Sequence, residues 1–281
     1  MLGLEGKVMG RFLVFLVALA FAFDGQAQQA TEKHLSFGVV PQHDPEKMAR
    51  QWAPLMAYLS KQAGVTIRFS TAPSIPEFER RLAEGVYDLA YMNPYHFTVF
   101  NERPGYRAMA RQNNHVIKGI LVVSKDARAS SLRDLKGKSL AFPAPHAFAA
   151  TLITRAQLEK TAPGYKASFV QSHDSVYRAV SEGLFAAGGG IHRTLGEMEP
   201  AIRKKIRVLW ESAGFTGHAI ASHPSMPEEQ REAILGALLS MSSTQAGQEL
   251  LENIGMAGFV EAVGSDWDDV RRLGLGVPLG H

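Results

Sequence analysis

Residues 35–92 read LSFGVVPQHDPEKMARQWAPLMAYLSKQAGVTIRFSTAPSIPEFERRLAEGVYDLAYM, and this stretch decides the fold. Its apolar, β-rich start predicts a strand at 35–40, and Asp44 followed by Pro45 is typical of a helix start. Apolar residues then recur at helical spacing up to Gly64, where a helix is expected to end. The pattern continues with a strand, a helix and a strand, at 65–69, 74–85 and 86–92. This β-α-β-α-β order predicts a parallel sheet with helices on its faces.

The same alternation resumes near His115 and continues to the C-terminus. Strands are predicted at 117–124, 139–142, 167–170, 184–187, 207–210 and 218–222, and helices at 131–136, 146–160 and 172–182. From Pro227 onward the chain is predicted to be mostly helical. We therefore predict an α/β protein of two lobes, 31–115 with 220–281 and 116–219, linked by two crossings near 115–118 and 212–218. A single continuous doubly wound sheet is the alternative interpretation.

The N-terminal residues differ from the rest of the chain. Lys7 and Arg11 precede an unbroken apolar run at 12–23, and Gly25-Gln26-Ala27 provides small residues two positions apart. This order is typical of a secretory signal peptide, here residues 1–27 with cleavage near Ala27. The apolar run is shorter than the roughly 20 residues of a membrane span, although an uncleaved anchor remains the alternative. We expect export to the periplasm.

Composition excludes several classes of protein. Removing residues 1–27 takes away two charges of each sign, so the net charge stays at +3, and the basic residues are spread along the chain. No nucleic-acid partner is therefore expected. The chain has no cysteine, which suits an oxidising compartment and rules out thiol catalysis, disulfides and cysteine-based metal sites.

Enzyme and cofactor signatures are equally sparse. Gly137-Lys138-Ser139 resembles the end of a phosphate-binding loop, but Leu132 stands where that motif requires glycine. The sequence has no G-x-S-x-G elbow, no H-E-x-x-H pair, and no two of its ten histidines four residues apart. We predict no cofactor, no metal and no catalysis; an unrecognised catalytic site is the alternative.

Three junctions between a strand and a helix carry polar and aromatic residues instead. They are 91–96 (YMNPYH), 142–148 (FPAPHAF) and 172–175 (SHDS). Ligands of parallel α/β sheets bind beyond the carboxyl ends of the strands, near free backbone amides at helix starts. Three such junctions, spread over two lobes, predict one shared cleft. For the third junction, simple helix capping by Ser172 and Asp174 is the alternative.

The sequence also resembles a known family. VVPQ at 39–42, YDLAYMNPY at 87–95, DLKGKSLAF at 134–142 and SHDSV at 172–176 look like the PhnD-like phosphate-, phosphite- and phosphonate-binding periplasmic proteins. The likeness runs from about His34 to Arg271. It implies a type II periplasmic binding fold that supplies an ABC importer. It also implies that Tyr91 forms an aromatic wall and that His173 reaches a bound oxyanion.

Two positions depart from that family pattern. Ala147-Phe148-Ala149 replaces a hydroxyl-rich Ser-Thr-Ser loop, and Ala186 replaces a carboxylate suited to a ligand amine. Both departures argue against an aminoalkyl phosphonate. Phe148 predicts a drier, more apolar pocket, whereas a helix start with nearby histidines still favours an anion. We expect a small oxyanion, or an organic anion with an apolar part.

The resulting prediction is a monomeric solute-binding protein that closes on its ligand and delivers it to an ABC permease. The predicted ligand-binding residues are His43, Tyr91, Asn93, Tyr95, His146, Ala147, Phe148, His173, Asp174 and Ser175. Whether His192 and Arg193 reach the cleft is left open by the sequence. One alternative is a sensory binding protein that reports to a membrane histidine kinase or other receptor. Another is an enzyme or metal chaperone that uses the histidines.

Overall fold

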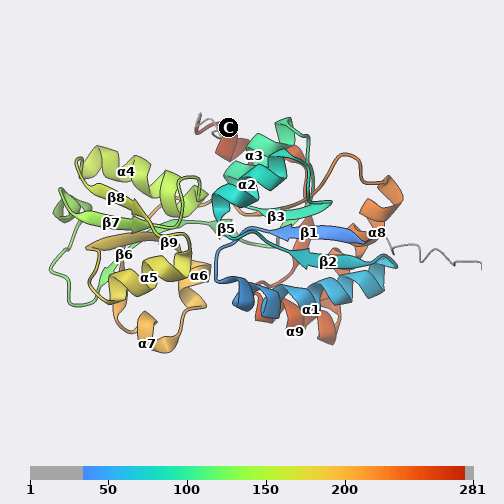
Figure 1. Ribbon diagram of the computed structural model, residues 1–281, viewed down its shortest axis with the longest axis horizontal. Helices are drawn as coiled ribbons and strands as arrows, with labels where there is room; N and C mark the ends of the chain where they lie inside the picture. The colour runs from blue at the N-terminus through green and yellow to red at the C-terminus, as the bar shows by residue number, and fades with distance from the viewer. Residues whose placement is uncertain (1–33, 276–281) are drawn as a thin grey trace, which may run out of the picture. The chain divides into compact units, whose positions relative to one another are not determined.

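The structure is a computed structural model that describes residues 34–275, which fall within one compact unit. The predicted signal peptide at 1–27 and the last residues of the predicted first lobe, 276–281, lie outside the described residues. Figure 1 shows two main β-sheets, each flanked by helices. Among the described residues, no helix is long and apolar enough to span a membrane.

The first sheet has six strands in the order β13-β4-β12-β3-β1-β2. They are β1 (Leu35–Val39), β2 (Ile67–Ser70), β3 (Leu89–Met92), β4 (Arg107–Gln112), β12 (Ala219–Ser222) and β13 (Phe259–Glu261). Strands β1, β2 and β3 are parallel, which confirms the predicted β-α-β-α-β unit. Strand β12 runs antiparallel between β3 and β4, so a segment from late in the chain completes this sheet.

Helices cover both faces of the first sheet. They are α1 (Pro45–Ala63), α2 (Ile75–Ala83), α3 (Pro94–Glu102), α8 (Glu228–Ser240), η3 (Met241–Ser243), α9 (Gln245–Asn253), η4 (Gly264–Trp267) and α10 (Asp268–Arg271). The carboxylate of Asp44 accepts from the Lys47 amide at 2.9 Å, and Ser74 accepts from the Glu77 amide at 3.3 Å. These caps begin α1 and α2 where the sequence predicts them.

The second sheet has five strands in the order β10-β6-β9-β7-β8. They are β6 (Gly119–Ser124), β7 (Ser139–Phe142), β8 (Lys166–Phe169), β9 (Ala187–Ile191) and β10 (Ile206–Glu211). Its helices are η1 (Leu132–Leu135), η2 (Phe148–Ile153), α4 (Thr154–Thr161), α5 (His173–Ser181), α6 (His192–Gly196) and α7 (Pro200–Arg203). Separate apolar clusters lie on the two faces of this sheet.

The glycine run at 188–190 forms the middle of β9, whereas the predicted strand at 184–187 ends before it. A Cβ on Gly189 would lie 2.0 Å from the Ala150 carbonyl oxygen, and one on Gly190 would lie 2.2 Å from the Tyr177 hydroxyl. The strand therefore needs glycine because η2 and α5 press directly on its two faces.

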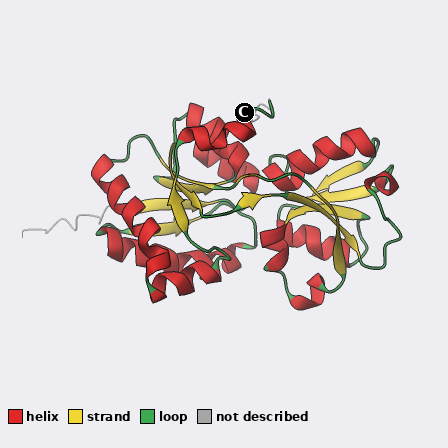
Figure 2. Cartoon of the chain, turned by 180° about the vertical axis from the view of Figure 1, so that it is seen from behind, coloured by secondary structure: helices red, strands yellow, loops and turns green. Residues whose placement is uncertain are grey.

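A short third sheet lies where the chain crosses between the two larger ones. Strand β5 (Val116–Ile117) pairs antiparallel with β11 (Phe215–Thr216). Figure 2 shows the chain passing between the two larger sheets beside this small one. The large apolar cluster of the first sheet extends here to Ala147, Phe148, Ala149 and Ile191 of the second.

Several elements differ from the sequence prediction. The junction at 91–96 implied a helix after β3 without giving its bounds, and strand β4 was not predicted. Strand β13 interrupts the region expected to be helical after Pro227. The helix expected at 146–160 starts at Phe148 with a π-helical turn. This wider turn places η2 against β9, where only glycine leaves room.

Candidate functional site

A small cavity lies where the two larger sheets meet. Its volume is about 10 Å³, room for about one water molecule. Both sheets contribute to its walls, which are Val40, Gln42, Ile75, Asn93, Ile117, Ala147, Phe148, Ala149, Ala150, His173, Ile191 and His218. Most of these residues follow the carboxyl ends of β1, β3, β7, β8 and β9, the edge at which α/β sheets bind ligands.

Gln42 is held from three sides. Its backbone oxygen accepts from the His173 amide at 3.1 Å. Its side-chain oxygen accepts from the Arg193 guanidinium, and its Nε2 lies 3.2 Å from Nε2 of His218. Because arginine only donates, the Gln42 atom that faces Arg193 must be the amide oxygen. The amide nitrogen therefore faces His218, which accepts from it through an unprotonated Nε2.

The two histidines that line the cavity are neutral. Burial is the main cause of the low pKa of His218, which lies well below 6.5. Burial likewise lowers the pKa of His173 to about 3, with a further contribution from the charge of His43. Nδ1 of His173 lies 3.2 Å from Oγ1 of Thr194, and the ring of Tyr91 stacks on His218 at 4.9 Å. These rings offer hydrogen bonds without charge.

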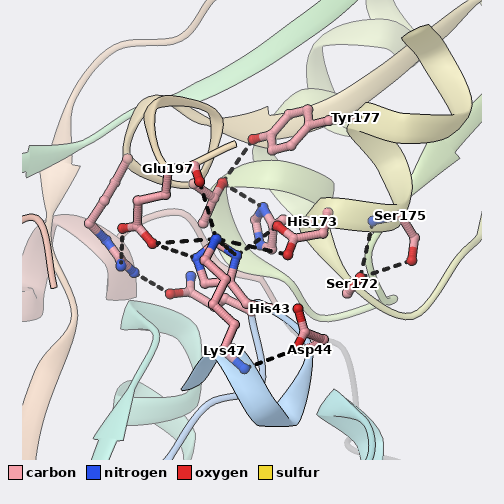
Figure 3. A network of polar contacts seen from close by, with 12 residues as sticks. His43, Asp44, Lys47, Ser172, His173, Ser175, Tyr177 and Glu197 are labelled. Carbon is pink, nitrogen blue, oxygen red and sulfur yellow. Dashed lines mark hydrogen bonds and ion pairs between the residues drawn. The ribbon is translucent and has the colours of Figure 1, made fainter. Parts of the chain in front are cut away.

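A cluster of charged side chains lies beside the cavity. Figure 3 shows its contacts around His43, Lys47 and Glu197. We call His43, Lys47, Asp174, Arg193 and Glu197 the charged cluster. Nδ1 of His43 lies 2.7 Å from Asp174, and Nε2 lies 2.8 Å from Glu197. Lys47 is 3.9 Å from each carboxylate, and Arg193 is 3.1 Å from Glu197. His43 directly precedes the cap of α1, and Lys47 lies in the first turn of that helix. Asp174 lies in α5, Arg193 in α6 and Glu197 at the end of α6.

Contacts inside the cluster offset the effect of burial on the pKa values of His43 and Glu197. Burial alone lowers the pKa of His43, but the hydrogen bonds to Asp174 and Glu197 outweigh it and raise the pKa above 6.5. Burial alone raises the pKa of Glu197, yet the bond to His43 and the charge of Arg193 bring it to about 2. Opposite charges within 4 Å favour the charged forms of both groups.

A second set of contacts joins the two sheets on the other side of the cavity. Glu79 lies 3.0 Å from Nδ1 of His146 and 2.9 Å from Nε2 of His96. Asn93 accepts from the His96 amide at 2.8 Å, which caps α3, and donates to the His146 carbonyl at 3.1 Å. Burial raises the pKa of Glu79, but the bonds to His146 and His96 outweigh it and lower it to about 2.

The start of η2 brings the most apolar wall. Phe148 is 1% exposed, and its ring meets Phe215 edge-on at 5.5 Å. The Thr151 amide donates to the Ala147 carbonyl at 2.7 Å, so the amides at 148–150 precede the first bonded turn of the helix. These amides are suited to donate hydrogen bonds to an anion.

The predicted site residues thus differ in where they lie. Asn93, Ala147, Phe148 and His173 line the cavity, and His43 and Asp174 belong to the charged cluster. Tyr91 and Tyr95 are buried behind the wall, and His146 bonds Glu79. Ser175 bonds the helix cap Ser172 at 2.9 Å and does not line the cavity.

Several residues at the site were not predicted. Gln42 and His218 line the cavity, and Glu197 and Glu79 hold the contacts beside it. Of the pair left open, Arg193 belongs to the charged cluster, whereas His192 bonds Glu211 on the surface. Gln42 stood in the quoted VVPQ motif, but Glu197 gave no local signal. Within 34–275, no three histidine, aspartate or glutamate side chains are placed to hold a metal ion.

Comparison with known proteins gives a consistent result. A family model described as "ABC transporter, phosphonate, periplasmic substrate-binding protein" matches residues 37–267. The phosphonates-binding periplasmic protein of Escherichia coli (strain K12) is 21% identical over 267 residues, which cover 87% of this chain and 77% of that protein.

Two solved structures share the fold. PhnD1 from Prochlorococcus marinus, in complex with methylphosphonate, has a TM-score of 0.78 at 16% identity and covers 86% of this chain and 97% of that chain. A binding protein component of an ABC phosphonate transporter from Pseudomonas aeruginosa has a TM-score of 0.78 at 15% identity and covers 87% of this chain and 86% of that chain. The type II periplasmic binding fold and the resemblance to PhnD-like proteins are thereby confirmed.

Proposed function

We propose that this chain, which belongs to the family of periplasmic substrate-binding proteins of phosphonate ABC transporters, captures a small phosphonate-like anion in the cavity between its two sheets. The observation that carries the proposal is the convergence of uncharged polar side chains from both sheets, Gln42, Asn93, His173 and His218, on one cavity. The amides at the start of η2 complete a set of donors for an oxyanion. We propose that the protein binds this ligand without chemical conversion and passes it to an ABC permease.

The cavity as it stands is smaller than a phosphonate. A volume of about 10 Å³ holds about one water molecule, so a ligand requires the walls to move apart. We propose the lobes 31–115 with 220–281 and 116–219, and a hinge at the paired strands β5 and β11. The antiparallel pairing of Ile117 with Phe215 supports this hinge, because a two-stranded link permits bending while the larger sheets stay intact.

Ligand contact is proposed for the residues that line the cavity. Of the residues proposed from sequence, these are Asn93, Ala147, Phe148 and His173, to which Gln42 and His218 are added. His43 and Asp174 act beside the ligand through the charged cluster. We propose that Tyr91 supports the wall from behind, since its ring lies between Trp52 and His218, 4.9 Å from each.

A thermal-shift screen of the purified mature protein tests the proposal. The panel contains methylphosphonate, phosphite, phosphate, 2-aminoethylphosphonate, sulfate and small carboxylates. Ligand at 100 times its dissociation constant adds about 2.7 kcal/mol of stability, a shift of several degrees. We expect a selective response to methylphosphonate. No response to any anion from a well-folded protein would contradict the proposed function.

A further inference from the structure

The charged cluster contains one more cation than anions. Its carboxylates are Asp174 and Glu197, and its cations are Lys47, Arg193 and His43 when His43 is protonated. These groups are poorly accessible to water, since the side chains of Asp174 and Arg193 are each 10% exposed. Solvent therefore screens their charges less than it would on the surface. With His43 protonated, the cluster carries a net charge of +1.

The geometry around His43 favours the protonated ring. Nδ1 of His43 forms a hydrogen bond with Asp174 at 2.7 Å, and Nε2 forms an ion pair with Glu197 at 2.8 Å, so a proton on either nitrogen lies beside a carboxylate. The groups that face His43 and do not favour its protonated ring are Lys47, whose Nζ lies 3.0 Å from Nδ1, together with Arg193 and the neutral His173. Two carboxylates in direct contact outweigh these cations, and the pKa of His43 is raised accordingly.

The cavity itself has no formal charge on its walls. Gln42, Asn93, His173 and His218 are its polar side chains, and both histidines are neutral. The remaining walls are small or apolar, with Phe148 the largest. The positive charge nearest to a ligand here thus comes from the neighbouring charged cluster, whereas the Glu79 carboxylate on the other side of the cavity also disfavours a second negative charge on the ligand.

Building on the proposed function, we infer that the cavity selects a small organic anion with a single negative charge, whose apolar substituent packs on Phe148. One negative charge balances the net charge of the cluster. A second negative charge on the ligand would be buried without a counter-charge, which is strongly unfavourable. The ligand class is therefore the singly charged form of a small alkyl oxyacid, such as a monoprotonated alkylphosphonate or an alkylsulfonate.

Calorimetric titration with three tetrahedral anions tests this inference. Methylphosphonate loses its second proton near neutral pH, methanesulfonate has nearly the same shape and always carries one charge, and sulfate carries two. At about pH 6, where the His43 ring is protonated, we expect methylphosphonate and methanesulfonate to bind and sulfate to bind at least tenfold more weakly. At about pH 9, methylphosphonate should lose at least tenfold in affinity as it becomes doubly charged.

Methanesulfonate isolates the contribution of His43, because its own charge does not change with pH. Its affinity should fall as pH rises through the pKa of His43, and binding above that pKa should take up a proton, measured from titrations in buffers of different ionisation enthalpy. In His43→Gln the affinity should be weaker at low pH and independent of pH. His223→Gln is the matched control, since the His223 ring bonds Ser225, outside the cluster, and the substitution should leave the pH dependence unchanged.

The outcomes separate this inference from the proposed function. Binding of methylphosphonate that strengthens from about pH 6 to about pH 9, or sulfate binding tighter than methanesulfonate, would overturn the single-charge inference and leave anion capture intact. Methanesulfonate binding with no proton uptake in the wild-type protein would remove His43 from the account even if His43→Gln fails to fold. Failure of all three anions would contradict the proposed function itself.

Discussion

The cavity and the charged cluster are adjacent in the sequence at two places, where one residue lines the cavity and the next belongs to the cluster. Gln42 and His173 line the cavity, whereas their neighbours His43 and Asp174 lie in the cluster. His43 and His173 are both buried, yet the pKa of His43 is raised and that of His173 is lowered to about 3. The difference comes from partners: two carboxylates contact His43, and a threonine hydroxyl contacts His173. Burial alone therefore does not decide the charge of a histidine.

This contrast places charge next to the cavity but not on the side chains that line it. The neutral wall provides donors with defined direction, such as the amide of Gln42, which Arg193 and His218 orient. The cluster supplies charge from behind that wall and also joins the two sheets. Changes to the wall and to the cluster should therefore have different consequences.

The largest expected effect is on the apolar side of the wall. Phe148→Ala removes a fully buried ring that packs on Phe215, so the free energy of unfolding should fall by about 3–5 kcal/mol. Urea denaturation measures this change. Phe148→Leu, which keeps most of the apolar volume, should cost less. A loss under about 1 kcal/mol for the alanine variant would show that Phe148 does not fill the cavity wall.

Removing the orienting cation of the cluster should affect binding most. Arg193→Met leaves Gln42 without its donor and Glu197 without a buried counter-charge, so methylphosphonate affinity should fall about 100-fold. Calorimetry measures the affinity. Arg178→Met is the control, because Arg178 pairs with Glu199 on the exposed surface. Equal effects of the two substitutions would contradict a specific role for the cluster.

The two histidines should give stability changes with opposite dependence on pH. The raised pKa of His43 contributes stability that is full below about pH 6.5 and is lost as pH rises through its folded-state pKa. The lowered pKa of His173 contributes stability above about pH 6.5 that is lost as pH falls toward about 3.

Urea unfolding at about pH 5.5 and about pH 8.5 checks these signs. His43→Gln should be most destabilising at the lower pH, and His173→Asn at the higher pH. Working above about pH 5 avoids the titration of Glu79 and Glu197, whose stability contributions are lost between about 4.5 and about 2. The same pH trend in both variants would contradict the contrast between the two rings.

The smallest effect is expected at Ser175, outside both regions. Its hydroxyl bonds the cap residue Ser172, so Ser175→Ala should leave methylphosphonate affinity within about twofold and cost under about 1 kcal/mol of stability. Ser172→Ala, which removes the cap itself, should cost about 1 kcal/mol. A large loss of affinity in Ser175→Ala would return Ser175 to the binding site.

The sequence predicted those features that depend on local chemistry. The caps at Asp44 and Ser74, the parallel strands and the cavity-lining His173 and Phe148 all follow from short segments. The function of Asn93 as a helix cap was visible in the sequence but was interpreted only as ligand binding. A run of polar residues thus predicts where a site lies better than it predicts which contact each side chain makes.

Long-range contacts could not be predicted in this way. Glu197 meets His43 only after folding, and nothing in its own segment distinguishes it from a surface glutamate. The glycines of β9 are explained by the close approach of Ala150 and Tyr177, two residues far away in sequence. Which charges remain uncompensated beside the cavity likewise depends on three separate segments coming together.

A crystal structure of the protein grown with methylphosphonate would show whether the cavity between the two sheets binds the ligand. The account predicts the phosphonate group between Gln42, His173 and the amides at the start of η2, with its methyl group against a displaced Phe148. The charged cluster should remain intact beside it. An empty cavity with the ligand bound elsewhere, or no bound ligand at saturating concentration, would contradict the account.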